Sequence, residues 1–337
     1  MIAFGLLALV SLTEEFSVSV PFHPLSDEYI DHINSLQTTW KAGRNFPKDM
    51  PLSNIKRLLG ALKSENKENL QTVHHVRGDD EVIPDTFDAR ENWPDCESIR
   101  LIRDQSKCGS CWAVAAAAAM SDRVCIFSNA TDQTLVSDED LLSCCSDCGH
   151  GCGGGRPYAA WVYWQQRGIV TGGPYNSTTG CKAYSMPPCE HGGTPGSLPQ
   201  CPSKGYNTPG CVRSCDKGST LSYKESKTYA AQAYYVGVND EQIQLEILKN
   251  GPVEASFDVY SDFLTYKSGI YQRTSDDSIG GHAVKLIGWG EENNVPYWLI
   301  TNSWNEDWGD KGIFKILRGT NECHIEEDIV AGLPQLH

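Results

Sequence analysis

The chain has 337 residues, 40% of them hydrophobic, so it is long enough to bury a core and is not expected to be disordered or fibrous. Its 28 basic and 43 acidic residues give a net charge of −15. Because this is the wrong sign for binding nucleic acid through counterion release, no nucleic-acid partner is expected. The 14 cysteines indicate an oxidising compartment and therefore the secretory pathway.

The first 82 residues contain no cysteine and have the pattern of segments that are removed during maturation. An apolar run at 2–10 is about half as long as a membrane crossing, which predicts a signal peptide over residues 1–16; a buried N-terminal strand is the alternative. No later apolar run reaches about 18 residues, so the mature protein is not expected to span a membrane.

Residues 17–82 are predicted to form a removable pro-region, with a small accessory domain as the alternative. Amphipathic stretches at 27–40 and 52–62 have helix-start signals at Ser26 and Ser53. The polar tail at 63–81 is expected to be a flexible, protease-accessible linker.

Residues 83–337 are predicted to form an α+β catalytic domain. A run of five alanines marks a helix over 111–124, and residues 171–222 have the composition of long loops held by crosslinks. Strands are predicted over 253–259, 283–289, 297–301 and 312–317. A helical half followed by a strand-rich half indicates two subdomains with an active-site cleft between them.

The sequence QSKCGSCW at 105–112 contains two of the candidate catalytic residues. Cys111 is predicted at the start of its helix, where the helix dipole favours a thiolate. A redox dithiol with Cys108, or a zinc site with Cys108, Cys145 and Cys148, are alternatives, although ordinary disulfides account for the same cysteines. A catalytic nucleophile is favoured because it also explains two segments further along the chain. No metal or other cofactor is expected.

Those segments are GGHAVKLIGWG around His282 and NSWNEDWGDKG around Asn302. His282 follows two glycines at a strand start, so its ring can project into a cleft. Asn302 can orient the imidazole through a hydrogen bond that the Trp304 indole shields from water. Gln105 can donate a side-chain N–H to an oxyanion alongside the backbone N–H of Cys111.

Together these motifs resemble the papain superfamily and, more closely, its cathepsin B branch. SDEYIDHINSLQTTWKAGRNF resembles the branch's propeptide and FDAR its mature start, and DQSKCGSCW, CGGG, CEH, GGHA and NSWN follow in family order. The resemblance implies a papain-like fold with a helical left subdomain and a β-barrel-like right subdomain.

The resemblance also implies roles for the candidate residues: Cys111 as nucleophile, His282 as general base and then acid, Asn302 as its orienter and Gln105 as oxyanion donor. Peptides and proteins would be hydrolysed through a thioester acyl-enzyme. The enzyme would be a zymogen inhibited by its own propeptide, monomeric when mature, and lysosomal or secreted. An inert homologue that acts as a binding protein is the alternative.

Cysteine parity limits the disulfides. If Cys111 is free, 13 cysteines remain and at least one more is unpaired. The resemblance implies that this one is Cys323. It implies six bridges: Cys96–Cys125, Cys108–Cys152, Cys144–Cys211, Cys145–Cys148, Cys181–Cys215 and Cys189–Cys201.

Departures from the family pattern bear on specificity. The resemblance implies an occluding loop at about 187–208, in which two adjacent histidines hold a substrate's C-terminal carboxylate. Here Gly192 follows His191, and 194–200 contains no Arg to face Asp307. His191 can still pair with Asp104. The loop is expected to open readily, giving endopeptidase activity at least comparable to dipeptide release.

Further substrate-binding residues are also implied by the resemblance. The backbone of Gly154 and Gly155 is expected to pair with an extended substrate. The pocket for the second residue before the scissile bond would comprise Arg156, Pro157, Ser256, Ala283 and Asp328. His191 and Trp304 are also expected to contact substrate. Neutralisation of Asp328 by Arg156 predicts a preference for hydrophobic over basic residues. An Arg156 that points to solvent, leaving Asp328 to select Arg, is the alternative.

Two local features complete the sequence analysis. Ser106 and Lys107 stand where the family commonly has Gly-Ser, which adds a positive charge near the thiolate. Sequons predict glycosylation at Asn129 and Asn176.

Overall fold

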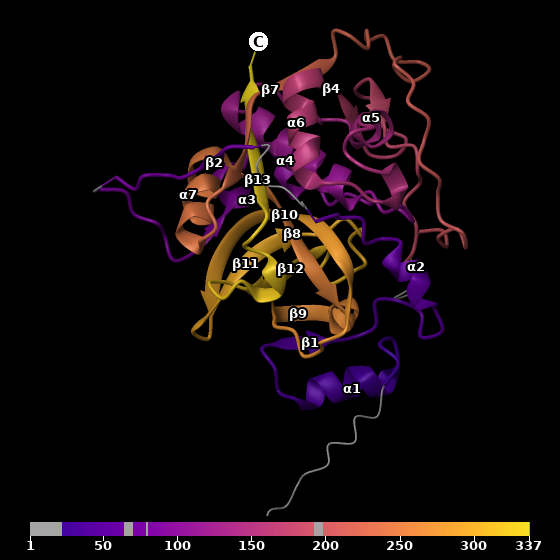
Figure 1. Cartoon of the computed structure of the whole chain (residues 1–337), viewed down its shortest axis with the longest axis vertical. Helices are drawn as coiled ribbons and strands as arrows, with labels where there is room; N and C mark the ends of the chain where they lie inside the picture. The colour runs from indigo at the N-terminus through magenta and orange to yellow at the C-terminus, as the bar shows by residue number, and fades with distance from the viewer. Residues whose placement is uncertain (1–21, 64–69, 79, 192–197, 337) are drawn as a thin grey trace, which may run out of the picture.

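The structure is a computed structural model that describes residues 22–63, 70–78, 80–191 and 198–336 (Figure 1). The predicted signal peptide lies outside these residues. The helices are α1 Asp27–Ser35, α2 Leu52–Lys56, α3 Ala89–Asn92, α4 Cys111–Phe127, α5 Asp138–Cys144, α6 Pro157–Arg167 and α7 Asp240–Asn250. Single 3₁₀ turns are η2 Glu97–Arg100, η3 Gly151–Gly153, η4 Ser261–Thr265 and η5 Glu322–His324.

The strands are short in the first half of the chain and long in the second. They are β1 Trp40–Ala42, β2 Thr72–Val73, β3 Phe87–Asp88, β4 Ile169–Val170, β5 Gly172–Gly173, β6 Lys182–Ala183, β7 Lys227–Val236, β8 Val253–Tyr260, β9 Tyr266–Tyr271, β10 Ser278–Glu292, β11 Val295–Thr301, β12 Ile313–Leu317 and β13 Ile329–Gln335. Strands β8, β10, β11 and β12 confirm the four strands predicted from the sequence. None of the described helices combines the length and hydropathy that crossing a bilayer requires.

One large sheet dominates the second half of the chain. Its strand order is β1-β9-β12-β11-β10-β8-β13-β7-β2, with β3 pairing with β10 and β4 with β7. The expected mixture of helices and sheet is confirmed, but the described strands form an open sheet and not a closed barrel. Both outer strands, β1 and β2, belong to the predicted pro-region, so this segment covers both edges of the sheet.

Helix α4 lies between the sheet and the other helices. It packs against β10 on one side and against α5 and α6 on the other (Figure 1). Every residue from Cys111 to Cys125 is buried, and the two charged ones, Asp122 and Arg123, form ion pairs with Lys285 and Glu246 respectively. The alanines that mark this helix in the sequence thus lie between the sheet and the other helices. This position brings the N-terminus of α4 to the boundary between the two halves.

The core divides in the way that two subdomains require. One cluster of buried side chains fills the sheet half and includes Phe263, Trp289 and Trp298. A second fills the helical half and includes Trp112 and Trp161. At their boundary lies a small cluster of Ala61, Cys111, Ala115 and Ala283. The predicted nucleophile therefore lies where the two subdomains meet.

The first part of the pro-region follows the sequence signals in part. Helix α1 begins as predicted, with the Ser26 side chain accepting a hydrogen bond from the Tyr29 N–H. Helix α2 begins at Leu52 with Pro51 as its N-cap, so the start signal predicted at Ser53 is wrong by two residues. It ends at Lys56, although the amphipathic pattern continues to residue 62. The apolar residues after Lys56 face the catalytic body and do not continue the helix.

The tail at 63–81 differs from the flexible linker that was expected. Strand β2 pairs in parallel with β7. The His75 Nε2 lies 2.5 Å from the Glu246 Oε2, and Gln242 exchanges two hydrogen bonds with the His75 backbone. The described residues of this tail are therefore docked on β7 and α7. The polar composition of the tail did not predict this docking, because the polar groups that the tail contacts are far away in the sequence.

Six disulfides hold the loops to this framework. They are Cys96–Cys125, Cys108–Cys152, Cys144–Cys211, Cys145–Cys148, Cys181–Cys215 and Cys189–Cys201, the pairs that the resemblance implies. Cys111 and Cys323 are free and buried. Because Cys108, Cys145 and Cys148 are each bonded to another cysteine, neither the redox dithiol nor the zinc site is present. The described residues within 171–222 are mostly loop, as predicted, apart from β5 and β6.

Candidate active site

Cys111 is the first residue of α4 and is fully buried beneath the pro-region. Its backbone N–H belongs to the first turn, where N–H groups have no partner within the helix. The Cys111 Sγ accepts a hydrogen bond from the backbone N–H of Gly60, at 3.2 Å. A pro-region peptide group thus lies directly on the predicted nucleophile.

His282 and Asn302 meet across two neighbouring strands of the sheet. His282 lies on β10, and Asn302 follows directly after β11. The His282 Nε2 lies 2.7 Å from the Asn302 Oδ1, and the Trp304 ring lies 4.7 Å from the imidazole ring at an angle of 31°. Among the described residues, the His282 Nδ1 has no hydrogen-bond partner. Asn302 thus holds one ring nitrogen, the contact that was predicted from the sequence.

Burial keeps both reactive groups neutral in this form of the protein. Desolvation raises the pKa of the Cys111 thiol to about 11, although the backbone N–H groups of Ala283 and Gly60 oppose the shift. Desolvation lowers the pKa of His282 to about 4, although the hydrogen bond with Asn302 favours its cation. Between these two values the neutral forms of the thiol and of the imidazole are both favoured while the pro-region covers them.

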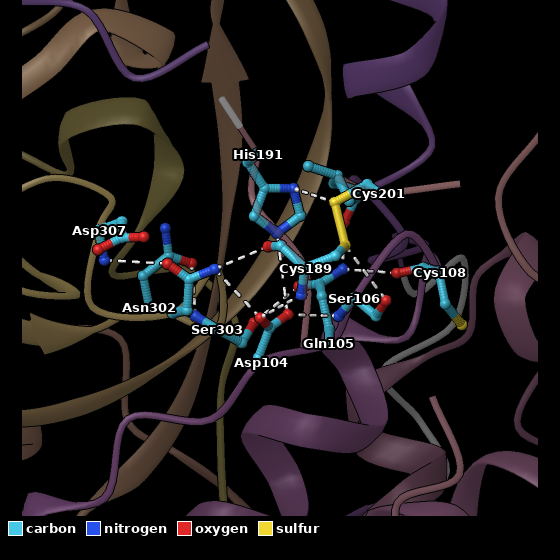
Figure 2. Close-up of polar contacts among 12 residues, drawn as sticks. Asp104, Gln105, Ser106, Cys108, Cys189, His191, Cys201, Asn302, Ser303 and Asp307 are labelled. Carbon is cyan, nitrogen blue, oxygen red and sulfur yellow. Dashed lines mark hydrogen bonds and ion pairs between the residues drawn. A yellow bond between two sulfur atoms is a disulfide. The ribbon is translucent and has the colours of Figure 1, made fainter. Parts of the chain in front are cut away.

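Gln105 is already in contact with a peptide carbonyl. Its Nε2 donates to the carbonyl oxygens of Leu58, at 2.9 Å, and Cys108, at 2.7 Å. Its Oε1 accepts from the Ser303 hydroxyl at 2.7 Å (Figure 2). Ser303 therefore fixes which end of the amide faces the cleft, a role that the sequence analysis did not assign. Its position next to Asn302 was visible, but its partner lies 198 residues away.

The predicted substrate-pairing glycines hold the pro-region backbone. The Gly155 N–H donates to the Gly60 carbonyl, and the Leu62 N–H donates to the Gly155 carbonyl, both at 2.9 Å. A Cβ on Gly155 would lie 2.5 Å from the Trp112 ring, and Gly154 has a φ of +109°. Only glycine suits these positions. On the opposite wall, Gly281, which the sequence analysis did not single out, accepts from the Ala61 N–H.

Some of the predicted subsite residues lie together and others do not. Ser256 and Asp328 line a pocket of about 140 Å³ with Ala61, Leu62 and Lys63 of the pro-region. Arg156 is the N-cap of α6 and Pro157 follows it, and neither is among the described residues that line this pocket. Ala283 lies beside Cys111. This lining favours an Asp328 that acts without Arg156, the alternative stated above.

The expected pair of His191 with Asp104 is present, with 3.8 Å between Nε2 and Oδ1. Figure 2 shows His191 pointing toward Asp104 beside the Cys189–Cys201 disulfide. Asp104 also accepts hydrogen bonds from the Cys189 N–H and the Asn305 side chain. The loop stem is thus fastened to the residue next to Gln105. Gly192 and residues 193–197 lie outside the described residues.

Two further sets of residues bear on sites outside the cleft. Cys189, His191 and Cys201 lie close enough to hold a metal, but the two cysteines are bonded to each other and offer no thiolate. Asn129 and Asn176 are both exposed, so a glycosyltransferase can reach them. Their glycosylation stays a prediction.

Comparison with known proteins agrees with this geometry. Residues 83–333 match the family described as papain family cysteine protease, and residues 25–65 match the peptidase family C1 propeptide. The chain is 48% identical to cathepsin B-like cysteine proteinase 4 of Caenorhabditis elegans over 98% of both chains. It is 51% identical to a cathepsin B-like cysteine proteinase of Schistosoma japonicum, over 92% of this chain and 91% of that protein.

Solved structures show the same fold with a pro-region in place. Procathepsin B S9 from Trypanosoma congolense superposes with a TM-score of 0.81 at 36% identity, covering 94% of this chain and all of that one. Digestive procathepsin L2 from Tenebrio molitor has a TM-score of 0.68 at 23% identity, with 92% and 89% of the two chains covered, and supports the fold alone. The chain belongs to the papain family of cysteine proteases, and within it to the cathepsin B-like peptidases that are made as zymogens with a propeptide.

Proposed function

We propose that this chain is a cysteine-type endopeptidase of cathepsin B type that hydrolyses protein substrates through a thioester acyl-enzyme. The observation that supports this best is the peptide already in the cleft. The Gln105 Nε2 donates to one peptide carbonyl, that of Leu58, while the Cys111 Sγ contacts a peptide N–H two residues later, that of Gly60. The proposed oxyanion donor and nucleophile thus contact the same stretch of pro-region backbone.

The proposed reaction has two halves, the acylation of Cys111 and the hydrolysis of the resulting thioester. The Cys111 thiolate attacks the carbonyl carbon, and the resulting oxyanion accepts hydrogen bonds from the Gln105 side chain and the Cys111 backbone N–H. The His282 imidazolium then protonates the leaving amine, and the C–N bond breaks to leave a thioester. In the second half, His282 takes a proton from water, hydroxide attacks the thioester, and the acid leaves as the thiolate is restored. Asn302 holds the ring in place throughout.

The pro-region can occupy this site without being cut there. The sulfur of Cys111 faces the N–H of Gly60, which has no electrophilic carbon to attack. Ala61 also forms a parallel β-bridge with Gly155, which holds the segment against the wall of the cleft. The segment thus blocks the cleft as an inhibitor. We assign residues 17–82 to the removable pro-region and 83–337 to the catalytic domain, after a signal peptide at 1–16.

The proposed setting follows from the same features. Six disulfides and a propeptide suit a protein made in the secretory pathway and used in lysosomes or outside the cell. The mature enzyme is proposed to act as a monomer without a cofactor. The alternative of an inert binding protein is disfavoured because nucleophile, imidazole, orienting amide and oxyanion donor are all in place.

The balance of activities depends on the loop at 187–208. The described latch is the His191–Asp104 pair, and the chain lacks a second histidine after His191 to clamp a C-terminal carboxylate. We therefore propose endopeptidase activity at least equal to dipeptide release.

The test compares peptides that differ only in a free or amidated C-terminus. The processed enzyme should cut the amidated peptide internally at a kcat/KM at least equal to that for dipeptide release from the free one. Cys111→Ala should abolish both activities, and alkylation of Cys111 should do the same in proportion to the label. Much faster dipeptide release contradicts the balance proposed here. An enzyme that hydrolyses neither peptide before labelling, although its Cys111 thiol can afterwards be alkylated stoichiometrically, would be an inert homologue.

A further inference from the structure

A second pocket lies on the helical side of the cleft, and the positively charged Lys107 is one of the residues that line it. Its volume is about 290 Å³, and it is lined by Lys107, Gly109, Cys152 and Gly153 together with residues 205–208 and Arg57 of the pro-region. The Cys108–Cys152 disulfide joins two of the contributing segments. The third is fastened by the hydrogen bond from the Tyr206 N–H to the Lys107 carbonyl, at 3.0 Å. The pocket is therefore part of the folded framework.

This pocket adjoins the nucleophile. A Cβ placed on Gly60, the residue whose N–H contacts the Cys111 Sγ, would lie 1.9 Å from the Gly109 carbonyl oxygen. Gly109 is one of the residues that line the pocket. The substrate residue that replaces Gly60 at the sulfur must therefore pass along this wall.

The alternation of side chains selects which substrate residue faces the pocket. The pocket lined by Ser256 and Asp328 lies on the sheet side of the cleft. The family resemblance implies that this pocket binds the second residue before the scissile bond. Successive side chains of an extended peptide point to opposite sides. The next residue, whose carbonyl carbon Cys111 attacks, thus points to the helical side, where Lys107 lies.

The charges in the pocket are of one sign. Lys107 is 6% exposed, and its Nζ spends one of its three N–H donors on the Ser203 carbonyl, at 2.8 Å. Among the described lining residues there is no carboxylate, and Arg57 adds a second positive charge. Burial and the nearby Arg57 lower the pKa of Lys107. When the pro-region leaves, Arg57 leaves with it, and Lys107 stays as a cation without a counter-charge in the lining.

We propose that this pocket binds a carboxylate side chain, Asp or Glu, on the substrate residue whose carbonyl carbon is attacked, and that Lys107 determines this preference. The inference rests on the proposed peptidase function and names the substrate class of the same site. A charge-assisted hydrogen bond from the Lys107 ammonium to the carboxylate supplies the attraction. The residue type matters because Lys107 stands where the family commonly has an uncharged serine.

The test uses the processed enzyme and three amidated peptides that differ only at that residue, with Glu, Gln or Arg. Glu and Gln have nearly the same shape, so their ratio of kcat/KM reports charge alone. We expect a Glu-to-Gln ratio of about five at low ionic strength, falling as salt is added, and the lowest value for Arg. In Lys107→Gln the ratio should fall to about one. Rates are normalised to the amount of Cys111 that can be alkylated.

Lys204→Gln is the matched control, because Lys204 is an exposed neighbour whose side chain does not line the pocket. It should keep the wild-type ratio. Equal rates on Glu and Gln peptides in the wild type, or a preference that survives Lys107→Gln, overturn the pocket assignment and leave the peptidase function standing. Failure of the unlabelled enzyme to hydrolyse any of the three peptides, when a parallel sample shows that all of its Cys111 can be alkylated, overturns both.

Discussion

At the scale of single residues, the reactivity of Cys111 depends on what covers it. The pro-region buries both the thiol and the imidazole, and burial penalises the charged form of each. The helix dipole that the sequence suggested as the source of a thiolate is therefore outweighed by desolvation as long as the cleft is filled. Removing the pro-region lets water reach Cys111 and His282. Solvation then favours the thiolate and the imidazolium over their neutral forms.

This predicts a large change in the pH dependence of alkylation. In the zymogen, the rate of Cys111 alkylation by iodoacetamide should be low at pH 5–8 and rise only as the pH approaches the raised thiol pKa of about 11. In the processed enzyme the rate at pH 6 should be at least about tenfold higher, because an imidazolium stabilises the thiolate. Cys323→Ser in both samples leaves Cys111 as the one free thiol, and mass spectrometry of the intact chain gives the rate. Equal rates at pH 6 would contradict the burial argument.

Single residues also show how far the sequence reaches. Cys111, His282, Asn302 and Gln105 could be proposed as catalytic residues because their motifs carry chemistry that few other residue patterns explain. Ser303 could not, because a serine acquires its role only from the Gln105 amide that it contacts. Hydrogen-bond partners distant in the chain are invisible to local pattern.

At the scale of elements, the pro-region segment after α2 shows how tertiary contacts override helical periodicity. The apolar spacing at 52–62 continues beyond Lys56, but the backbone from Gly60 onward hydrogen-bonds to Gly155 and Gly281 on the two walls of the cleft. Its apolar side chains pack against these walls. The apolar spacing that predicts a longer helix therefore occurs in a segment that is not helical. Gly60 permits the closest approach of this segment to the catalytic body.

Gly60→Val should therefore unmask the active site without cleavage. The added Cβ would lie 1.9 Å from the Gly109 carbonyl, a backbone atom that has no room to move aside. We expect the cleft segment to be displaced and Cys111 in the uncut chain to be alkylated at least about tenfold faster at pH 6, as in the processed enzyme.

Gly78→Ala is the control, because a Cβ at Gly78 meets no heavy atom closer than 3.8 Å. It should leave the alkylation rate of the zymogen unchanged. A Gly60→Val chain that stays as unreactive as the wild type would show that the segment reaches the cleft by another path.

At the scale of the whole molecule, the pro-region completes the sheet as well as filling the cleft. Strand β1 pairs with β9 at one edge, and β2 pairs with β7 at the other. Exposed sheet edges invite association with other chains, so their coverage protects the zymogen. The sequence predicted the α+β class and the helix-then-strand order, because composition and periodicity record which faces are buried. It did not predict these two pairings, since short edge strands carry almost no pattern of their own.

The disulfides set how firmly the long loops are held to this framework, and loop length makes their contributions unequal. Cys144 and Cys145 are neighbours, yet Cys144–Cys211 closes a separation of 67 residues and Cys145–Cys148 one of 3. In the chain-entropy description, replacing the first pair by serines should cost roughly 4 kcal/mol of unfolding free energy and replacing the second roughly 2 kcal/mol. Urea unfolding of the full chain, made inactive by Cys111→Ala, measures both against the same parent. Equal losses would mean that local packing around Cys144 and Cys145, and not the entropy of the unfolded loops, determines what these bridges contribute.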